Sequence, residues 1–189
     1  MTSRPMLILV AGGPGAGKTT FGRALARRLR EAILLDKDVI ASVWVDAMLE
    51  SFDGGRVDRD SAFYWNTVRA LEYGALMATA LDNLVLGKSV IAVAPFGPEL
   101  RDSAWIDRCR QSLMTSQATL HVVWLVADAI IARDRMQLRG DARDGWKLAN
   151  WDEFAACDRF GAPPGNWIVL RNDAGSRIDE LVDRVMAEL

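Results

Sequence analysis

The sequence predicts a single doubly wound α/β domain of about five parallel strands that spans residues 1–189. Short apolar runs alternate with longer segments of helical period along the chain. These runs contain almost no polar residues, which is typical of parallel strands covered by helices on both faces of a sheet. Half of the 189 residues are apolar and a quarter are charged, so the composition suits one globular domain with a substantial core.

Five apolar runs are predicted to form the strands: residues 6–11, 32–36, 89–96, 120–127 and 167–170. The segments between these runs have the period of amphipathic helices. They comprise an Arg-rich helix after residue 20, helices over about 39–51, 61–86 and 99–114, a second Arg-rich segment from about residue 129, and a last helix over 176–189.

Local patterns add detail to three of these helices. Val39, Val43 and Ala47 recur every four residues and are expected to share one face of the 39–51 helix. Asp128 is predicted to cap the second Arg-rich segment. A Ser-x-x-Asp pattern that begins at Ser176 is predicted to cap the last helix.

Charge and composition exclude several classes of function. The formal net charge of −2 gives no general attraction to nucleic acid or to an anionic membrane. No apolar run approaches the ~20 residues of a membrane span. Cys109 and Cys157 form no C-x-x-C pair or Cys/His cluster typical of zinc or redox sites. The apolar N-terminal run leads directly into a Gly-rich loop, unlike a signal peptide, so we expect a cytoplasmic protein.

Residues 11–20, AGGPGAGKTT, match the phosphate-binding Walker A pattern G-x-x-x-x-G-K-[ST] between a predicted strand and a predicted helix. The glycines permit a close backbone approach, and the exposed N–H groups with the helix N-terminus form an anion nest. Lys18 supplies positive charge for the β- and γ-phosphates, and Thr19 a hydroxyl for Mg²⁺. A Gly-rich turn with a solvated lysine is the alternative, but the order of strand, loop and helix favours a nucleotide site.

Two carboxylates follow the second predicted strand, in the sequence LLDKDVI. Asp36 and Asp38 are therefore expected at the carboxyl edge of the sheet, where ligands bind in open α/β folds. A carboxylate at this edge can accept the proton of a hydroxyl that attacks the γ-phosphate. The alternative is that both aspartates only cap the next helix. The upstream phosphate loop favours a functional role for at least one of them.

Arginines recur after the fourth predicted strand, in the sequence RDRMQLRGDARD. Arg135, Arg139 and Arg143 are spaced by four residues, with Arg133 nearby, and on a continuous helix they would share one face. Gly140 is a position at which the helix can end and become a flap. Converging guanidinium groups neutralise the transferring phosphoryl oxygens, and a closing lid excludes water. The alternative is a solvated helix face paired with neighbouring aspartates.

These three segments together resemble the small P-loop kinases, a group that includes chloramphenicol phosphotransferase, gluconate kinase, phage polynucleotide kinase and zeta toxins. The resemblance covers most of the chain, and the phosphate loop is its most specific part. It implies a three-layer P-loop NTPase sandwich with strand order 2-3-1-4-5, and an Arg-rich lid over about 128–160. It also implies ATP and Mg²⁺ as cofactors and phosphoryl transfer to a hydroxyl.

The resemblance also implies roles for individual residues. Asp38 matches the base aspartate of the family, and Asp36 then helps to hold Mg²⁺ with Thr19, or is itself the base if the alignment shifts by two residues. The predicted catalytic residues are Asp38, Lys18, Arg135 and Arg139. The predicted nucleotide contacts are Gly13, Gly15, Ala16, Gly17, Lys18, Thr19, Thr20 and Arg143.

Two positions depart from the family pattern. The arginine that often lies three residues after the base aspartate is Ala41 here, so an acceptor anchor is missing or comes from elsewhere. The third strand ends in Ala94, Pro95 and Phe96, without the usual carboxylate for the metal. This absence either gives a second-strand aspartate more weight as the metal ligand or weakens the assignment as a kinase.

The acceptor is expected to contact residues 39–73, the loop after Phe96 and the lid. These segments hold aromatic and basic side chains that suit a drug-like, nucleoside or sugar acceptor, although Trp44 and Trp65 fit core packing equally well. The full set is Trp44, Tyr64, Trp65, Arg69, Tyr73, Phe96 and Trp105. Two other functions stay open: an ATPase or switch without a phosphoryl acceptor, and a toxin-like nucleotide-sugar kinase. The basic residues gather near the expected triphosphate, which disfavours a polynucleotide acceptor.

Overall fold

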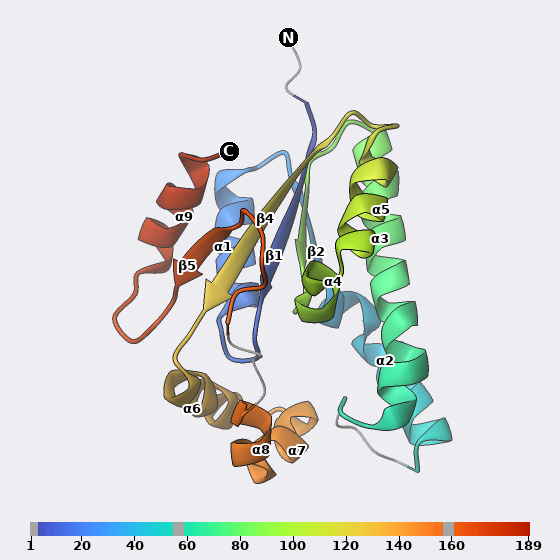
Figure 1. The fold of residues 1–189 in the computed structure, drawn as a ribbon, viewed down its shortest axis with the longest axis vertical. Helices are drawn as coiled ribbons and strands as arrows, with labels where there is room; N and C mark the ends of the chain where they lie inside the picture. The colour runs from blue at the N-terminus through green and yellow to red at the C-terminus, as the bar shows by residue number, and fades with distance from the viewer. Residues whose placement is uncertain (1–3, 55–58, 157–160) are drawn as a thin grey trace.

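The computed structural model describes residues 4–54, 59–156 and 161–189. Within these residues, five parallel strands form one sheet in the order β2-β3-β1-β4-β5, so the predicted fold class and strand order are confirmed (Figure 1). The strands are β1 (Met6–Gly12), β2 (Ile33–Asp36), β3 (Val90–Val93), β4 (Thr119–Val126) and β5 (Ile168–Arg171). Cys157 and part of the predicted 128–160 lid lie outside the described residues.

The helices occupy the segments between the strands. They are α1 (Lys18–Arg28), α2 (Lys37–Phe52), α3 (Arg69–Val85), α4 (Gly97–Arg101), α5 (Ser103–Leu113), α6 (Ala129–Arg139), α7 (Gly145–Ala149), α8 (Trp151–Ala156) and α9 (Ile178–Met186). A π-helical turn, η1 (Tyr64–Val68), precedes α3, and a 3-10 turn, η2 (Ala142–Asp144), precedes α7. None of the helices in the described ranges has the length and apolar character that crossing a membrane requires.

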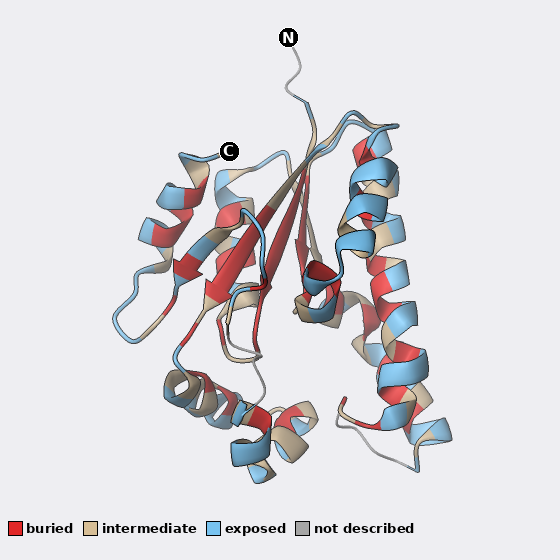
Figure 2. Ribbon diagram, viewed as in Figure 1, coloured by how far each residue is buried: buried red, intermediate tan, exposed pale blue. Residues whose placement is uncertain are grey.

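The core consists of two apolar layers, one on each face of the sheet. Successive strand residues point to opposite faces, so Leu7 and Leu9 pack toward α3 and α5, whereas Ile8 and Val10 pack toward α1 and α9. All four residues are fully buried. Figure 2 shows the strands buried along most of their length between the two helical layers. The uninterrupted apolar runs in the sequence follow from this covering on both faces.

The carboxyl ends of the strands meet at one edge of the sheet, where the segment that contains α6, α7 and α8 also lies (Figure 1). Asp128 caps α6 by accepting a hydrogen bond from the backbone N–H of Ile130 at 2.9 Å, as predicted. The helix ends at Arg139 because Gly140 adopts a left-handed conformation with φ 63°. The predicted interruption at Gly140 is therefore observed, and Arg143 lies on η2 instead of sharing a continuous helix with Arg139.

Two predicted helices differ from the observed ones. Residues 97–113 form two helices because the chain is extended at Asp102, whose carboxylate caps α5 by accepting from the N–H of Ala104 at 2.9 Å. In α2, the buried face is Ala41, Val45 and Leu49. Val39 and Val43 are 70% and 83% exposed, so the face that they share points to solvent, whereas Ile40, Trp44 and Met48 beside it pack on core clusters.

The predicted cap of the last helix is also wrong. The N-cap residue of α9 is Arg177, and its side chain makes no cap hydrogen bond. Ser176 instead accepts a hydrogen bond from the backbone N–H of Asp173 through its hydroxyl oxygen. The serine therefore stabilises the turn after β5 rather than the start of the helix.

Candidate active site

The phosphate loop joins β1 to α1 and leaves an open cradle of backbone N–H groups at the carboxyl edge of the sheet. Two glycines are required there for reasons of space. A Cβ on Gly12 would lie 2.3 Å from the carbonyl oxygen of Leu125, and a Cβ on Gly15 would lie 2.5 Å from that of Ala132. Both also have positive φ values, 140° and 74°. The motif thus packs against β4 and α6 as it curves around the position of a phosphate.

Lys18 lies at the start of α1 and donates a hydrogen bond from Nζ to the carbonyl oxygen of Gly13 at 2.8 Å. Burial lowers the pKa of Lys18 to about 8, and the nearby charge of Arg139 acts in the same direction, while Asp38 opposes the shift. An anion that approached this ammonium group would favour its charged form. The lysine is therefore poised to bind phosphate.

Thr19 and Asp36 form the candidate metal site. Thr19 Oγ1 donates to Asp36 Oδ2 at 2.8 Å, while Asp36 Oδ1 accepts from the backbone N–H of Asp38 at 3.0 Å and caps α2. The capping role considered for Asp36 is therefore observed, and the same carboxylate also lies beside the hydroxyl of the phosphate loop. One carboxylate and one hydroxyl are a typical protein contribution to a Mg²⁺ ion that keeps water and phosphate ligands.

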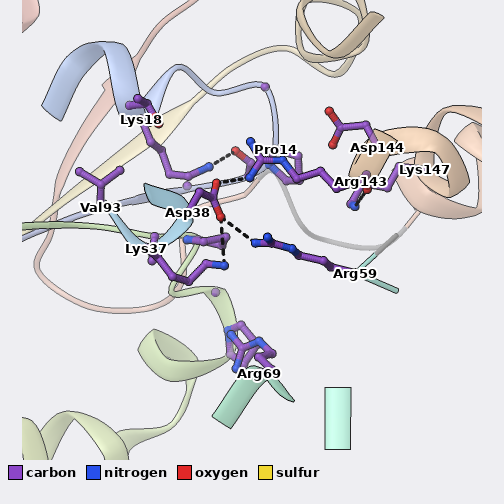
Figure 3. A pocket seen from close by; sticks show the side chains of 18 of the residues that line it. Pro14, Lys18, Lys37, Asp38, Arg59, Arg69, Val93, Arg143, Asp144 and Lys147 are labelled. Atoms are coloured by element: carbon purple, nitrogen blue, oxygen red, sulfur yellow. Dashed lines mark hydrogen bonds and ion pairs between the residues drawn. The ribbon is translucent and has the colours of Figure 1, made fainter. Parts of the chain in front are cut away.

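Asp38 lies in the first turn of α2 and contacts three cations (Figure 3). Its oxygens are 3.1 Å from Lys37 Nζ, 3.0 Å from Arg59 Nη1 and 2.5 Å from Arg143 Nη1. Burial opposes the charged form, but the charges of Lys37, Arg143 and Arg59 outweigh it and hold the pKa of Asp38 well below its usual range. The carboxylate is thus ionised, oriented and still 36% exposed to the cavity.

A buried carboxylate that the sequence did not reveal, Glu72 on α3, holds this arrangement from behind. It is fully buried and accepts from Lys37 at 3.0 Å with both oxygens, from Arg59 at 3.1 Å and from the phenol of Tyr64 at 2.7 Å. Two of the three cations around Asp38 are therefore fixed by Glu72. Arg59 also occupies the neighbourhood of Ala41, since it donates to Ser42 Oγ at 2.9 Å. A guanidinium group therefore lies beside the position at which the family pattern often has an arginine and this chain has Ala41.

The predicted lid arginines have separate surroundings. Arg135 donates to the carbonyl oxygen of Gly15 at 3.2 Å, so it contacts the phosphate loop itself. Arg139 pairs with Asp144, and Arg143 pairs with Asp141 at 2.8 Å as well as with Asp38. Arg133 instead stacks on Trp151 within the lid. Three of the four arginines thus converge on the phosphate loop and Asp38.

A cavity of about 430 Å³ joins these groups at the carboxyl edge of the sheet. The phosphate loop, with Lys18 and Thr19, lies at one end of it, and Asp38 lies along its wall. Its other end is lined by side chains from η1, α3, the loop after β3 and β4: Tyr64, Trp65, Arg69, Tyr73, Pro98, Arg101 and Trp124. Figure 3 shows Lys18 and Arg69 on opposite sides of Lys37 and Asp38.

Some predicted contacts lie away from this cavity. Thr20 is exposed, and Ala16 is buried with its carbonyl oxygen bonded to Asn172 Nδ2 at 2.8 Å. Phe96 is fully buried between Tyr73 and Trp105, at 5.4 Å and 6.1 Å between ring centroids. Trp44 and Trp105 also pack on core clusters. Trp124 was missed because a tryptophan inside an apolar strand has the same sequence pattern as an ordinary core residue.

The fold and the site are similar to those of the small P-loop kinases. A phosphate loop, a hydroxyl-carboxylate pair beside it, and a second carboxylate facing a cavity occur together on a five-stranded 2-3-1-4-5 sheet. Residues 7–159 match the family described as an AAA domain (AAA_33), and the chain belongs to that family.

The relatives point to the same class. A structure from Chloroflexus aurantiacus J-10-fl, provisionally described as a kinase, is 25% identical with a TM-score of 0.71, over 99% of this chain and 100% of that one. A gluconokinase from Sinorhizobium meliloti 1021 is 17% identical with a TM-score of 0.55, over 97% and 90% of the two chains. A shikimate kinase from Thermobifida fusca (strain YX) is 63% identical, but only over 38 residues, which are 20% of this chain and 21% of that protein.

One further structural neighbour was solved with a nucleotide analogue. The APS kinase CysC from Mycobacterium tuberculosis, in complex with AMPPNP and APS, is 16% identical with a TM-score of 0.53, over 97% of this chain and 96% of that one. At this identity the likeness extends to the fold alone.

Proposed function

We propose that this protein is an ATP-dependent kinase that transfers the γ-phosphate to a hydroxyl of a small molecule, with Asp38 as the general base. The observation that carries the proposal is one continuous cavity with the phosphate loop at one end, an aromatic wall at the other and Asp38 between them. A donor and an acceptor can therefore bind side by side.

The proposed reaction is a direct displacement at phosphorus. The acceptor oxygen attacks the γ-phosphorus, the bond from phosphorus to the β–γ bridging oxygen breaks, and ADP leaves with the bonding electrons. The hydroxyl proton passes to Asp38. Lys18, Arg139 and Arg143 stabilise the charge on the phosphoryl oxygens. Arg135, through its contact with the phosphate loop, supports the loop that holds the triphosphate.

The low basicity of Asp38 is compatible with this role. Phosphoryl transfer passes through a loose transition state, so the acceptor oxygen needs orientation more than early deprotonation. Bound phosphates also compete with Asp38 for Arg143, which pairs with the carboxylate at 2.5 Å. Loss of that pair raises the pKa of Asp38 as ATP binds, and it then becomes a better proton acceptor.

Thr19 and Asp36 fit the requirements of Mg²⁺. Their oxygens lie 2.8 Å apart beside the phosphate loop, and Mg²⁺ in nucleotide sites commonly takes few protein ligands together with phosphate oxygens. Over the described ranges, no three His, Cys, Asp or Glu side chains form a preformed metal cluster. Thr19 and Asp36 would hold the ion, which would supply positive charge to neutralise the phosphates of ATP.

A phosphorylation screen tests the proposal. The protein is incubated with γ-labelled ATP and Mg²⁺ over nucleosides, sugars and hydroxylated antibiotics, and labelled organic products are resolved from inorganic phosphate. We expect at least one labelled organic product, which Lys18→Ala loses together with ATP binding. ATP consumption that yields only inorganic phosphate would favour an ATPase or switch instead.

The affinity for ATP should depend on pH through Lys18. Burial places the pKa of this ammonium group at about 8, and bound phosphates favour its charged form. We therefore expect the Kd of a non-hydrolysable ATP analogue to be nearly constant from pH 7 to 7.5 and to rise progressively above pH 8, with proton uptake on binding at pH 8.5. Isothermal titration calorimetry in buffers of different ionisation enthalpy measures both effects. An affinity that stays constant up to pH 9.5 would contradict the assignment.

A further inference from the structure

The acceptor half of the cavity, defined as its wall of Lys37, Arg59, Tyr64, Trp65, Arg69 and Tyr73, contains several cations. Such a wall could be taken for an anion site. However, each of these cations already pairs with a carboxylate of the protein itself. We therefore do not expect the wall to bind an anionic ligand.

Lys37 has no N–H donor left for a ligand. An ammonium group has three donors. Those of Lys37 are directed at Glu72 Oε1 and Oε2, each at 3.0 Å, and at Asp38 Oδ1 at 3.1 Å. Its side chain is 4% exposed and that of Glu72 is fully buried. A ligand anion would have to break a buried ion pair, which leaves an uncompensated charge behind.

The guanidinium group of Arg69 pairs with a carboxylate along its edge and packs on aromatic rings with its flat faces. Nη1 and Nη2 donate to the two oxygens of Glu99 at 2.6 Å and 2.8 Å, a bidentate pair with both partners largely buried. The guanidinium also stacks on Tyr73 at 4.2 Å and on Trp65 at 5.1 Å from the ring centroids. Arg69 thus extends the aromatic wall as a flat surface instead of offering a free charge.

Arg59 and Lys147 also pair with carboxylates of the protein. Arg59 directs Nη1 to Asp38 and Glu72, and Nη2 to Ser42, with Asp46 3.5 Å away. Lys147, on the adjoining lid, pairs with Asp60 at 2.7 Å. Four cations on this side of the cavity therefore face four carboxylates: Lys37, Arg59, Arg69 and Lys147 against Asp38, Glu72, Glu99 and Asp60. Arg101 also lines this end of the cavity; it is exposed and donates to the carbonyl oxygens of Gly97 and Gly161, so it stands outside these four pairs.

The donor half of the cavity, at the phosphate loop, contains two cations that pair with no carboxylate among the described residues. Lys18 donates to one backbone carbonyl, and Arg135 donates to two, those of Gly15 and Asp173. Neither forms a carboxylate pair within the described ranges. Lys18 and Arg135 therefore keep donors for the phosphates of ATP, whereas Arg139 and Arg143 on the lid pair with Asp144 and with Asp38 and Asp141. The cations of the acceptor half differ from Lys18 and Arg135 because Lys37 and Arg69 are held in buried pairs with Glu72 and Glu99.

We propose that the acceptor is an uncharged hydroxyl compound with a flat or apolar face, and that acceptors carrying a carboxylate or an ammonium group are rejected. The carboxylates Glu72 and Glu99 are buried together with Lys37 and Arg69, so a charged acceptor that paired with any of these four groups would have to break a buried ion pair. An uncharged ring can instead pack on Trp65, Tyr73 and the stacked Arg69 while its hydroxyl reaches Asp38. This inference rests on the proposed function and narrows its substrate class.

Matched acceptor triplets test the inference. Each triplet shares one hydroxylated ring scaffold and carries a carboxylate, a primary amide or an aminomethyl group at one other position. Initial rates of label transfer from γ-labelled ATP give kcat/KM for each member. We expect the amide to exceed both charged members by at least about tenfold, which corresponds to ~1.4 kcal/mol of discrimination. A charged member that matches or exceeds the amide overturns the inference and leaves the kinase intact. If no member of any triplet becomes labelled, the proposed function is overturned, and the inference is overturned with it.

A variant of the protein provides a second test, which does not depend on the ring scaffold chosen for the acceptors. Glu99→Gln leaves Arg69 without its carboxylate, so kcat/KM for the carboxylate member should rise relative to the amide by about tenfold or more. Asp107→Asn removes an equal charge from α5, where Asp107 is exposed and pairs with Arg110 at 3.7 Å, and should leave the ratio unchanged. If the ratio of kcat/KM for the carboxylate member to that for the amide is the same in Glu99→Gln as in Asp107→Asn, the Arg69–Glu99 pair does not exclude anionic acceptors. The wild-type ratio decides the matter even if Glu99→Gln does not fold.

Discussion

Asp38→Asn is expected to lower the rate of phosphoryl transfer by about 10²–10⁴-fold, the range for loss of a positioned general base. The amide keeps the shape of the side chain but cannot take the proton of the acceptor hydroxyl. Affinity for a non-hydrolysable ATP analogue should be equal or higher, because Arg143 loses its 2.5 Å ion pair with Asp38 and is free to bind phosphate. Single-turnover kinetics and calorimetry measure the two effects separately.

Asp36→Asn is the matched control for this prediction. Its carboxylate lies 2.8 Å from Thr19 Oγ1, so its loss should raise the Mg²⁺ concentration that half-maximal activity requires. Asp38→Asn should leave that concentration unchanged. If Asp36→Asn abolishes transfer at saturating Mg²⁺ while Asp38→Asn stays active, the roles of the two carboxylates are reversed.

Glu72→Gln is expected to destabilise the protein by about 3–5 kcal/mol, the cost of removing one partner from a buried ion pair. Lys37 and Arg59 would keep their charge inside the protein with only the partly exposed Asp38 to balance them. The transfer rate should fall as well, because the two cations that orient Asp38 lose their anchor. Urea unfolding followed by tryptophan fluorescence measures the stability, and label transfer measures the rate.

Two variants separate the charge of Glu72 from its other contacts. Tyr64→Phe removes only the 2.7 Å hydrogen bond to Glu72 and should cost about 1–3 kcal/mol. Asp183→Asn removes an ion pair with Arg28 in which both side chains are more than half exposed, and should change stability little. A loss for Glu72→Gln no larger than that for Asp183→Asn would show that the buried network does not hold the site together.

The sequence was sufficient for the sheet because β1, β3 and the second half of β4 are buried on both faces, which leaves unambiguous apolar runs. Helix details were harder to predict where a single residue decides them. Asp102 interrupts the 97–113 segment by capping α5, and nothing in the local period marks this break. The buried face of α2 is set by contact with Tyr64 and Val68 rather than by its most apolar residues, so Val39 and Val43 lie exposed.

The phosphate-binding half of the site could be predicted from the sequence because its residues are contiguous in the chain. One strand, one turn and one helix contain the whole phosphate loop. The acceptor half depends on residues far apart in the chain. Glu72 contacts Lys37 across 35 positions, and Arg59 contacts Asp38 across 21. A glutamate inside a long helix gives no sign in the sequence that it will be fully buried. Only the folded arrangement shows that Arg59 supplies a cation near Ala41.

The most direct test of the central claim is the ratio of phosphorylated acceptor formed to ATP consumed, measured for the best substrate of the phosphorylation screen. The proposed mechanism predicts a ratio close to one for the wild-type protein, and no detectable product with Asp38→Asn on the same time scale, although that variant still binds the ATP analogue. ATP consumption that yields inorganic phosphate but no phosphorylated acceptor, equally in both proteins, would contradict the account.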